Sequence, residues 1–347
     1  MLYRHKVLKA GKTLSVQLLI IIILAVGVCF LVFFIIKNII LPKRALAAAN
    51  FHNKSETLRA MRAAKAAIEK DPKNAEAHYL LGKAYLADKR EEQAFREFRS
   101  ASRLGIEGKN IPETEFRKTL AFLYTKFHEE EEALKEYVLL IKKHPENPDY
   151  YFLAGKIFAS RSRADLAEQY FRKAINLNPQ DENFHIELGL FYYLAKRIKE
   201  ASDEFEAALK LNPVDGLSML YLGKIHKDAK DYAGAIPYLE KAARDPKYKL
   251  RGLVELGSGY MSLKMLDKAI SELERAVNII VKEEEPDSLY ARYFLAMCYE
   301  KTKEYAKAIV QWDLIYAQKK NFRDVGEKLT QYIEYRTGNM ENNQPKK

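Results

Sequence analysis

Histidine and cysteine, the residue types that most often bind metals or act as nucleophiles, are few in this chain. Its seven histidines are spread from His5 to His226, and its two cysteines, Cys29 and Cys298, form no CxxC pair. A helical zinc pair places its second histidine four residues after the first, but in the sequence HEEEE that begins at His128 this position is Glu132. The sequence therefore predicts no metal site and no disulfide framework.

Motifs for phosphate binding and for nucleophilic catalysis are also missing from the sequence. It contains no GxxxxGK[ST] loop and no GxSxG elbow; the nearest approach, Gly257-Ser258-Gly259, falls within an expected helix. Cys298 stands between Met297 and Tyr299 and is expected to pack in a helix instead of acting as a nucleophile. We therefore expect no catalytic residue and no cofactor, and so no enzyme.

The net charge of +11 is unevenly placed along the 347 residues. Residues 1–42 carry +5 and no acidic residue, which leaves a mild +6 for the rest of the chain. Nucleic-acid-binding proteins usually concentrate basic residues on one face or carry a recognisable module, and neither pattern is present here. We therefore expect no nucleic-acid partner.

A single long apolar run lies near the amino end. Residues 14–36 form 23 consecutive positions without a charge. At about 1.5 Å per residue such a helix spans the hydrocarbon core of about 30 Å, whereas the apolar region of a signal peptide has only about 7–15 residues. The sequence predicts a basic cytoplasmic tail at 1–13 and an uncleaved transmembrane helix at 14–41.

The charges around this run favour one orientation. The tail at 1–13 holds four Lys or Arg and no acid, which favours a cytoplasmic amino end, although Lys37, Lys43 and Arg44 on the far side oppose this bias. We expect a single-pass protein of the inner (cytoplasmic) membrane with its soluble domain on the extracytoplasmic side.

The remainder of the chain repeats itself at a fixed interval. The repeat is most visible in small residues, first a glycine or alanine and then an alanine twelve positions later, and we expect these residues to pack helices closely. They are Gly82, Ala94, Ala121, Ala133, Gly155, Ala167, Gly189, Ala201, Gly223, Ala235, Gly257, Ala269, Ala296 and Ala308. Prolines end several units, at Pro145, Pro179 and Pro213.

This pattern resembles the tetratricopeptide repeat, a 34-residue helix–turn–helix unit, and the clearest copy runs from His185 to Pro213. We call this interval one repeat length. The resemblance implies an all-α, right-handed superhelical solenoid at 75–322, with seven units that start near residues 75, 114, 148, 182, 216, 250 and 289. We expect a juxtamembrane helix or half-repeat at 42–74, a capping helix at 323–336 and a disordered tail at 337–347. Two longer connections, at 105–113 and 282–287, are expected to be either surface loops or points where the solenoid bends or docks a partner.

In this family the first helix of each repeat, helix A, lines a concave groove that binds peptides. The family register places fifteen candidate groove residues, in which apolar and aromatic side chains alternate with lysines. They are Tyr79, Lys83, Lys118, Phe122, Phe152, Lys156, Ile186, Leu190, Tyr193, Leu220, Lys224, Lys227, Val254, Tyr293 and Met297. The resemblance implies protein or peptide partners with apolar and acidic side chains.

Relatives that bind the acidic tails of heat-shock chaperones use paired lysine and asparagine side chains in their grooves. Here Leu86 and Phe122 stand where polar residues would be needed, so we do not expect that clamp.

An amino-terminal anchor followed by repeats resembles bacterial inner-membrane proteins that serve secretion, motility or envelope biogenesis. The prediction is therefore a membrane-anchored scaffold or adaptor in the assembly of a cell-envelope complex. Two alternatives remain open, a regulatory subunit that presents substrates to a membrane enzyme or protease, and a periplasmic holdase-type chaperone for translocated proteins. The oligomeric state is not indicated.

Overall fold

The computed structural model describes residues 41–107 and 109–332, and the side chains from residue 54 onward. The predicted basic tail, the transmembrane helix up to residue 40, the end of the capping helix beyond residue 332 and the predicted disordered tail lie outside these residues. Within the described part of the chain, no helix is both long enough and apolar enough to cross a membrane.

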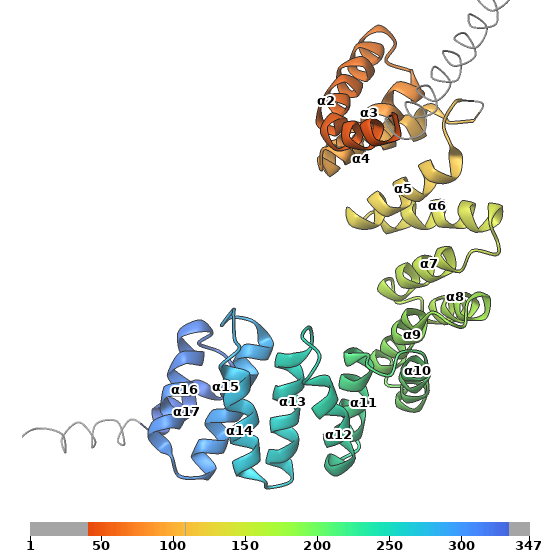
Figure 1. The fold of residues 1–347 in the computed structure, drawn as a ribbon. Helices are drawn as coiled ribbons and strands as arrows, with labels where there is room; N and C mark the ends of the chain where they lie inside the picture. The colour runs from red at the N-terminus through yellow and green to blue at the C-terminus, as the bar shows by residue number, and fades with distance from the viewer. Residues whose placement is uncertain (1–40, 108, 333–347) are drawn as a thin grey trace, which may run out of the picture. The chain divides into compact units, whose positions relative to one another are not determined.

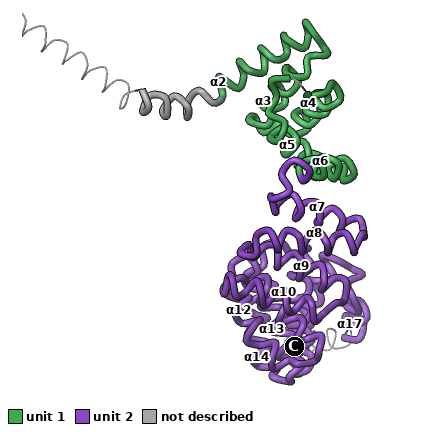
Figure 2. Tube along the Cα trace, turned by 90° about the vertical axis from the view of Figure 1, so that its right-hand side faces the viewer, with its two compact units in different colours: residues 1–140 green, residues 141–347 purple. Residues whose placement is uncertain are grey.

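The described residues form helices and connections, without a strand (Figure 1). The chain divides into two compact units, Met1–Leu140 and Ile141–Lys347, with the boundary inside α6 (Figure 2). The helices of unit 1 are α2 (Leu41–Lys70), α3 (Ala75–Ala87), α4 (Glu91–Leu104), α5 (Glu113–Lys126) and α6 (Glu130–Lys143). Those of unit 2 are α7 (Pro148–Ser160), α8 (Ala164–Leu177), α9 (Glu182–Leu194), α10 (Ile198–Leu211), α11 (Gly216–Asp228), α12 (Tyr232–Ala242), α13 (Lys249–Ser262), α14 (Leu266–Val277), α15 (Pro286–Lys301), α16 (Tyr305–Gln318) and α17 (Val325–Gln331).

From α3 to α16 the helices form seven consecutive pairs. In each pair we call the first member, an odd-numbered helix, helix A and the second helix B. Several helices A begin at a polar cap: the side chains of Asn74, Asn147, Asp181 and Asp215 each accept a hydrogen bond from a backbone N–H of the first turn. These caps satisfy backbone donors that the helix itself leaves unpaired.

A left-handed residue ends helix A in every pair. The seven residues are Lys89, His128, Ser162, Lys196, Lys230, Lys264 and Lys303, with φ between 58° and 65°. In the first pair the next N–H, that of Arg90, donates to the Tyr85 carbonyl at 2.8 Å and closes the helix end. This conformation costs a side-chain-bearing residue about 1 kcal/mol, so it persists because the packing of helix B against helix A holds it in place.

The small residues of the repeat bring the two helices of each pair together. A Cβ atom built on Gly82, Gly155, Gly189, Gly223 or Gly257 would lie 2.5–3.0 Å from the side chain sixteen residues later, a phenylalanine or leucine of helix B. The alanine twelve residues after each of these glycines is fully buried. Large side chains of helix B therefore lie directly against the helix A backbone, which forms a close-packed core.

The two longer connections are attached to neighbouring helices. In the first, the Ile106 and Ile111 side chains are buried, and the Asn110 N–H donates to Glu76 Oε1 at 2.7 Å. In the second, Glu283 pairs with Arg292 of α15. Each connection is therefore held to its neighbouring helices by specific contacts.

Candidate functional site

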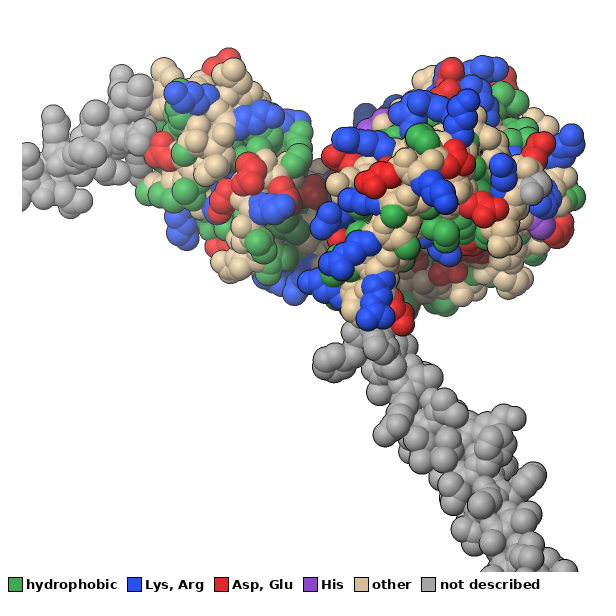
Figure 3. All heavy atoms as spheres, turned by 90° about the horizontal axis from the view of Figure 1, so that it is seen from above, with side chains coloured by type: hydrophobic (Ala, Val, Ile, Leu, Met, Phe, Trp, Pro, Cys, Tyr) green, Lys and Arg blue, Asp and Glu red, His purple; other side chains and the backbone are tan. Residues whose placement is uncertain are grey.

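The candidate partner surface consists of side chains that helices A direct away from helices B, and we call it the helix A face. Each unit has its own helix A face, carried by α3 and α5 in unit 1 and by α7, α9, α11, α13 and α15 in unit 2. Lys and Arg side chains are interspersed with acidic and hydrophobic ones over the surface seen in Figure 3. The character of the face therefore depends on which of its charges are paired.

Five of the predicted groove residues are buried, so the prediction that they line an accessible groove is wrong. They are Tyr79, Ile186, Leu220, Val254 and Tyr293. All five occupy the same position of the repeat, and Tyr79 shows the reason: its ring lies 5.8 Å from that of Phe98 on helix B and 5.9 Å from that of Phe116 on α5. An apolar side chain at this position packs between its own repeat and the next one.

In unit 1 the helix A face presents two unpaired cations and an exposed aromatic ring. Lys83 and Lys118 are exposed, and among the described residues no carboxylate forms a salt bridge with either. The Lys83 ammonium lies 5.5 Å from the centre of the Tyr79 ring. Phe122, one turn after Lys118 on α5, is 54% exposed. The two lysine ammonium groups can bind a carboxylate of a partner, and the Phe122 ring can bind an apolar side chain.

In unit 2 the predicted lysines are already paired with acidic residues of the next helix A. Lys156 Nζ donates to Glu187 Oε1 at 2.7 Å, and Lys227 Nζ donates to Glu255 Oε2 at 2.5 Å. Lys224 Nζ lies 3.6 Å from Glu255 Oε1. Burial opposes ionisation of Glu255, but Lys227, Lys224 and Arg251 outweigh it and lower the pKa of this carboxyl group.

Aromatic rings accompany these ion pairs in unit 2. The rings of Tyr193 and Tyr221 meet edge to face at 5.0 Å, and Tyr221 stacks on Phe205 at 5.3 Å. The Tyr193 hydroxyl donates to Asp228 Oδ2 at 2.9 Å. Burial and this hydrogen bond raise the pKa of Tyr193. The other predicted groove residues of unit 2, Phe152, Leu190 and Met297, are partly exposed.

The sequence analysis missed the acidic half of this surface. Glu187 and Glu255 each stand 31 residues after the lysine that they pair with, Lys156 and Lys224. This spacing joins one helix A to the next and could have been found by comparing acidic and basic positions of adjacent repeats.

Comparison with known proteins identifies the repeat. Family models described as tetratricopeptide repeat match residues 63–96, 131–182, 186–249 and 260–323, which is more than half of the chain. The chain belongs to the tetratricopeptide repeat family. Proteins of this family bind other proteins and act as interaction scaffolds, and stacked repeats supply extended surfaces for that purpose.

Solved tetratricopeptide repeat structures share the fold at low sequence identity. A tetratricopeptide repeat protein from Parabacteroides merdae ATCC 43184 has a TM-score of 0.53 and 14% identity over 74% of this chain and 97% of its own. The Cut9 complex with Hcn1 has a TM-score of 0.52 and 18% identity over 80% of this chain. Yeast Tom70 has a TM-score of 0.51 and 16% identity over 84% of this chain and 61% of its own. The chain spans 52% of the Cut9–Hcn1 chain that it matches. A sequence search of the curated proteins finds no match.

Two histidines of this tetratricopeptide repeat protein lie within hydrogen-bond distance of carboxylates. His78 Nδ1 lies 2.6 Å from Glu97 Oε2, and His185 Nδ1 lies 2.7 Å from Glu204 Oε2, in both cases joining helix A to helix B of one repeat. Cys298 is fully buried, and burial raises the pKa of its thiol to about 11. Within the described ranges, no group of three or more His, Cys, Asp or Glu side chains is placed to hold a metal ion.

Proposed function

We propose that this protein is a membrane-anchored scaffold that binds a peptide segment of a partner protein on the helix A face of unit 1. The observation that carries the proposal is the combination of unpaired Lys83 and Lys118 with the exposed Phe122 ring. Exposed aromatic anchors beside available cations are typical of surfaces that recognise peptides with apolar and acidic side chains.

The helix A face of unit 2 has a different chemical character from that of unit 1. Its lysines are neutralised by Glu187 and Glu255, so the rings of Tyr193 and Tyr221 and the side chains of Leu190 and Met297 supply most of its binding surface. We infer that this unit contacts apolar side chains, while charge recognition depends on unit 1.

Membrane attachment is supported by the uncharged run at 14–36, and it would concentrate partners beside the bilayer. We propose that the site of action is the inner membrane, with the repeats on the extracytoplasmic side, and that the partners belong to a cell-envelope assembly.

The binding surface can be tested by photo-crosslinking of the full chain in its own membrane. A photoreactive amino acid placed at Phe122 is expected to give adducts of discrete mass, and the same group at Arg96, exposed on α4, is the matched control. The charge reversals K83E and K118E should reduce the Phe122 adducts several-fold. Equal yields at both positions, or adducts unaffected by charge reversal, would contradict the proposal.

The orientation can be tested by thiol labelling of intact cells. Asn343 in the tail is replaced by cysteine, with Cys29 and Cys298 replaced by serine. Labelling by a reagent that does not cross the inner membrane supports an extracytoplasmic repeat domain. Labelling only after permeabilisation would reverse the orientation and direct the search to cytoplasmic partners.

The scaffold role can be separated from the two alternatives by the effect of deleting the gene. If the protein is a scaffold, its deletion should cause the partner proteins identified by crosslinking at position 122 to dissociate from one another. An intact complex with raised levels of one substrate would indicate a substrate-presenting subunit, and a general rise in aggregated envelope proteins would indicate a chaperone.

A further inference from the structure

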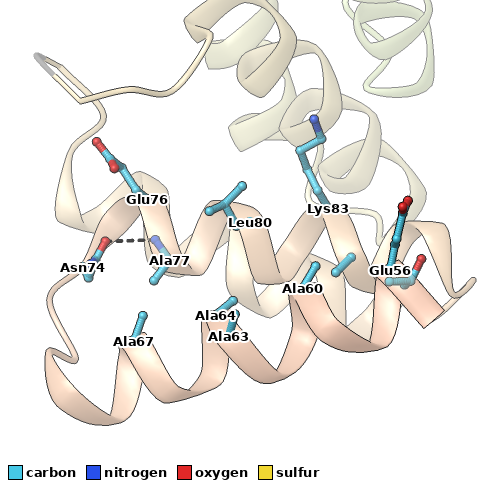
Figure 4. Close-up of a pocket in the computed structure, with 12 residues that line it drawn as sticks. Glu56, Ala60, Ala63, Ala64, Ala67, Asn74, Glu76, Ala77, Leu80 and Lys83 are labelled. Atoms are coloured by element: carbon cyan, nitrogen blue, oxygen red, sulfur yellow. Dashed lines mark hydrogen bonds between the residues drawn. The ribbon is translucent and has the colours of Figure 1, made fainter. Parts of the chain in front are cut away.

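An open groove lies between α2 and α3 at the amino-terminal end of unit 1 (Figure 4). Its volume is about 520 Å³, and alanines form much of its lining: Ala60, Ala63, Ala64 and Ala67 on α2, with Ala77 and Ala84 on α3. Leu80 of α3 also lines the groove and is 53% exposed. Ala64, Ala77 and Ala84 are buried at the base of the groove, whereas Ala60, Ala63 and Leu80 are exposed to solvent.

The repeat register shows what is missing from this groove. Ala60 and Ala67 stand one repeat length before Ala94 and Ala101 of α4, so the second half of α2 is in the register of a helix B. In all seven complete repeats the residue equivalent to Ala60 is an alanine with 0% exposure. Ala60 itself is exposed. The groove therefore has the position that a preceding helix A would fill.

The chain carries a segment with the sequence of such a helix directly before this point. Ala48 stands one repeat length before Gly82, at the small position, and Phe51 stands one repeat length before Tyr85, at the aromatic position. Ser55 stands one repeat length before Lys89, the left-handed residue that follows α3. The residue equivalent to Lys89 two repeats further along the chain is Ser162, which is a serine like Ser55 and is also left-handed. All three positions of the repeat signature are thus present.

We propose that Leu41–Asn53 docks in this groove as helix A of an eighth repeat, with the turn at Ser55. The continuous α2, Leu41–Lys70, is then one of two arrangements of the same segment. The continuous helix retains its backbone hydrogen bonds and leaves the alanine groove open. The hairpin exchanges a few of these bonds for burial of the groove.

Charges at the two ends of the groove suit a docked helix A. In the complete repeats helix A is followed by an antiparallel helix B, so a docked segment would run in the same direction as α3. Its amino end, the positive end of the helix dipole, would then lie beside Glu76, and its carboxyl end beside Lys83. Glu76 and Lys83 each have the sign opposite to the helix end that they would meet, and Glu56 also lines the groove near its Lys83 end.

A disulfide between positions 48 and 64 distinguishes the two arrangements. In a continuous helix these residues are separated by about 24 Å, whereas a disulfide requires Cα atoms about 4.4–6.8 Å apart. In the complete repeats the equivalent positions touch: a Cβ built on Gly223 would lie 2.5 Å from Leu239 Cδ2. The variant A48C/A64C is made in the full chain with Cys29 and Cys298 replaced by serine, and oxidised in its membrane. The control is A48C/A66C, because Ala66 is exposed on the same helix and does not line the groove.

The proposal expects a disulfide within one chain in A48C/A64C, at a yield several times that of the control. Ser55→Gly should raise this yield, because glycine favours a left-handed turn and weakens a continuous helix. A yield no higher than the control, even with glycine at position 55, would overturn the proposal. A disulfide that joins two chains would also overturn it, by showing that a second copy supplies the segment.

Discussion

Arg292 of α15 and Glu283 of the connection before it form a two-pronged ion pair. The Arg292 Nε–H donates to Glu283 Oε2 at 2.8 Å, and Nη2 donates to Oε1 at 2.6 Å. The third nitrogen, Nη1, donates to Gln311 Oε1 of α16 at 2.7 Å, and Arg292 is only 8% exposed. One guanidinium group therefore joins the longest connection of unit 2 to both helices of the repeat that follows.

Glu283→Gln should lower the free energy of unfolding by about 1–2 kcal/mol, because Arg292 loses its charged acceptor while it stays largely buried. Urea denaturation of the wild-type and variant proteins measures this change. Glu284→Gln is the matched control, since its exposed side chain adjoins Glu283 without contacting Arg292. Equal decreases in the free energy of unfolding for both variants would show that the ion pair between Glu283 and Arg292 does not stabilise the fold.

Gly189→Val should destabilise unit 2 by about 1–3 kcal/mol through overpacking. The reason is that a Cβ atom at Gly189 would lie 2.9 Å from Phe205 Cε1, and a valine adds two more methyl groups there. Gly326→Val is the control, because the nearest atom to its Cβ is 3.8 Å away. Thermal unfolding should show a lower melting temperature for the first variant and little change for the second.

Glu168 should make unit 2 more stable above about pH 4 than below it. Burial alone would raise the pKa of Glu168, but hydrogen bonds from Arg197, Tyr192 and Arg172 lower it to about 2. The unfolded chain has a value of about 4.3, so the stabilisation is present above that pH and is lost as the pH falls towards 2.

The measurement is the urea midpoint at pH 7 and pH 3 for the wild-type protein and Glu168→Gln. Glu168→Gln should have a lower urea midpoint than the wild type at pH 7, and the difference between the two midpoints should be smaller at pH 3. Glu206→Gln, a change at an exposed position of α10, should leave both midpoints close to those of the wild type. A difference that does not depend on pH would exclude the ionised carboxylate as its cause.

Glu255→Gln should change both stability and binding. Lys224 and Lys227 would lose their shared carboxylate, which should cost about 1–3 kcal/mol in chemical denaturation. The same change should strengthen the binding of a glutamate-rich peptide, measured by titration at low and high salt. Glu187→Gln is the comparison for stability. Because the ion pair of Glu187 with Lys156 is more exposed, this variant should lose less than about 1 kcal/mol of unfolding free energy.

The fold follows from the sequence because the residues that fix the repeat have a local, periodic role. Glycine or alanine at one position and alanine twelve residues later identify helix A and helix B, since larger residues would prevent the approach of Phe171 to Gly155 or of Phe205 to Gly189. The observed helices A begin at residues 75, 113, 148, 182, 216, 249 and 286.

The site could be predicted only in part because accessibility depends on the neighbouring repeat. Tyr79 and Lys118 occupy equivalent positions, yet the apolar side chain is buried against Phe116 and the charged one is exposed. The pairing of Lys227 with Glu255 depends on how one helix A lies beside the next. The family register assigns positions to a face, whereas contacts between repeats decide which of them a partner can reach.

The short sequence range of the contacts has a consequence for synthesis on the ribosome. Side-chain hydrogen bonds between neighbouring repeats span about one repeat length, as in Tyr193 and Asp228, which are 35 positions apart. Closing such short loops costs little entropy, and no helix has to wait for a distant part of the chain. Each repeat can therefore fold onto the preceding one soon after it emerges, while the carboxyl-terminal repeats are still being translated.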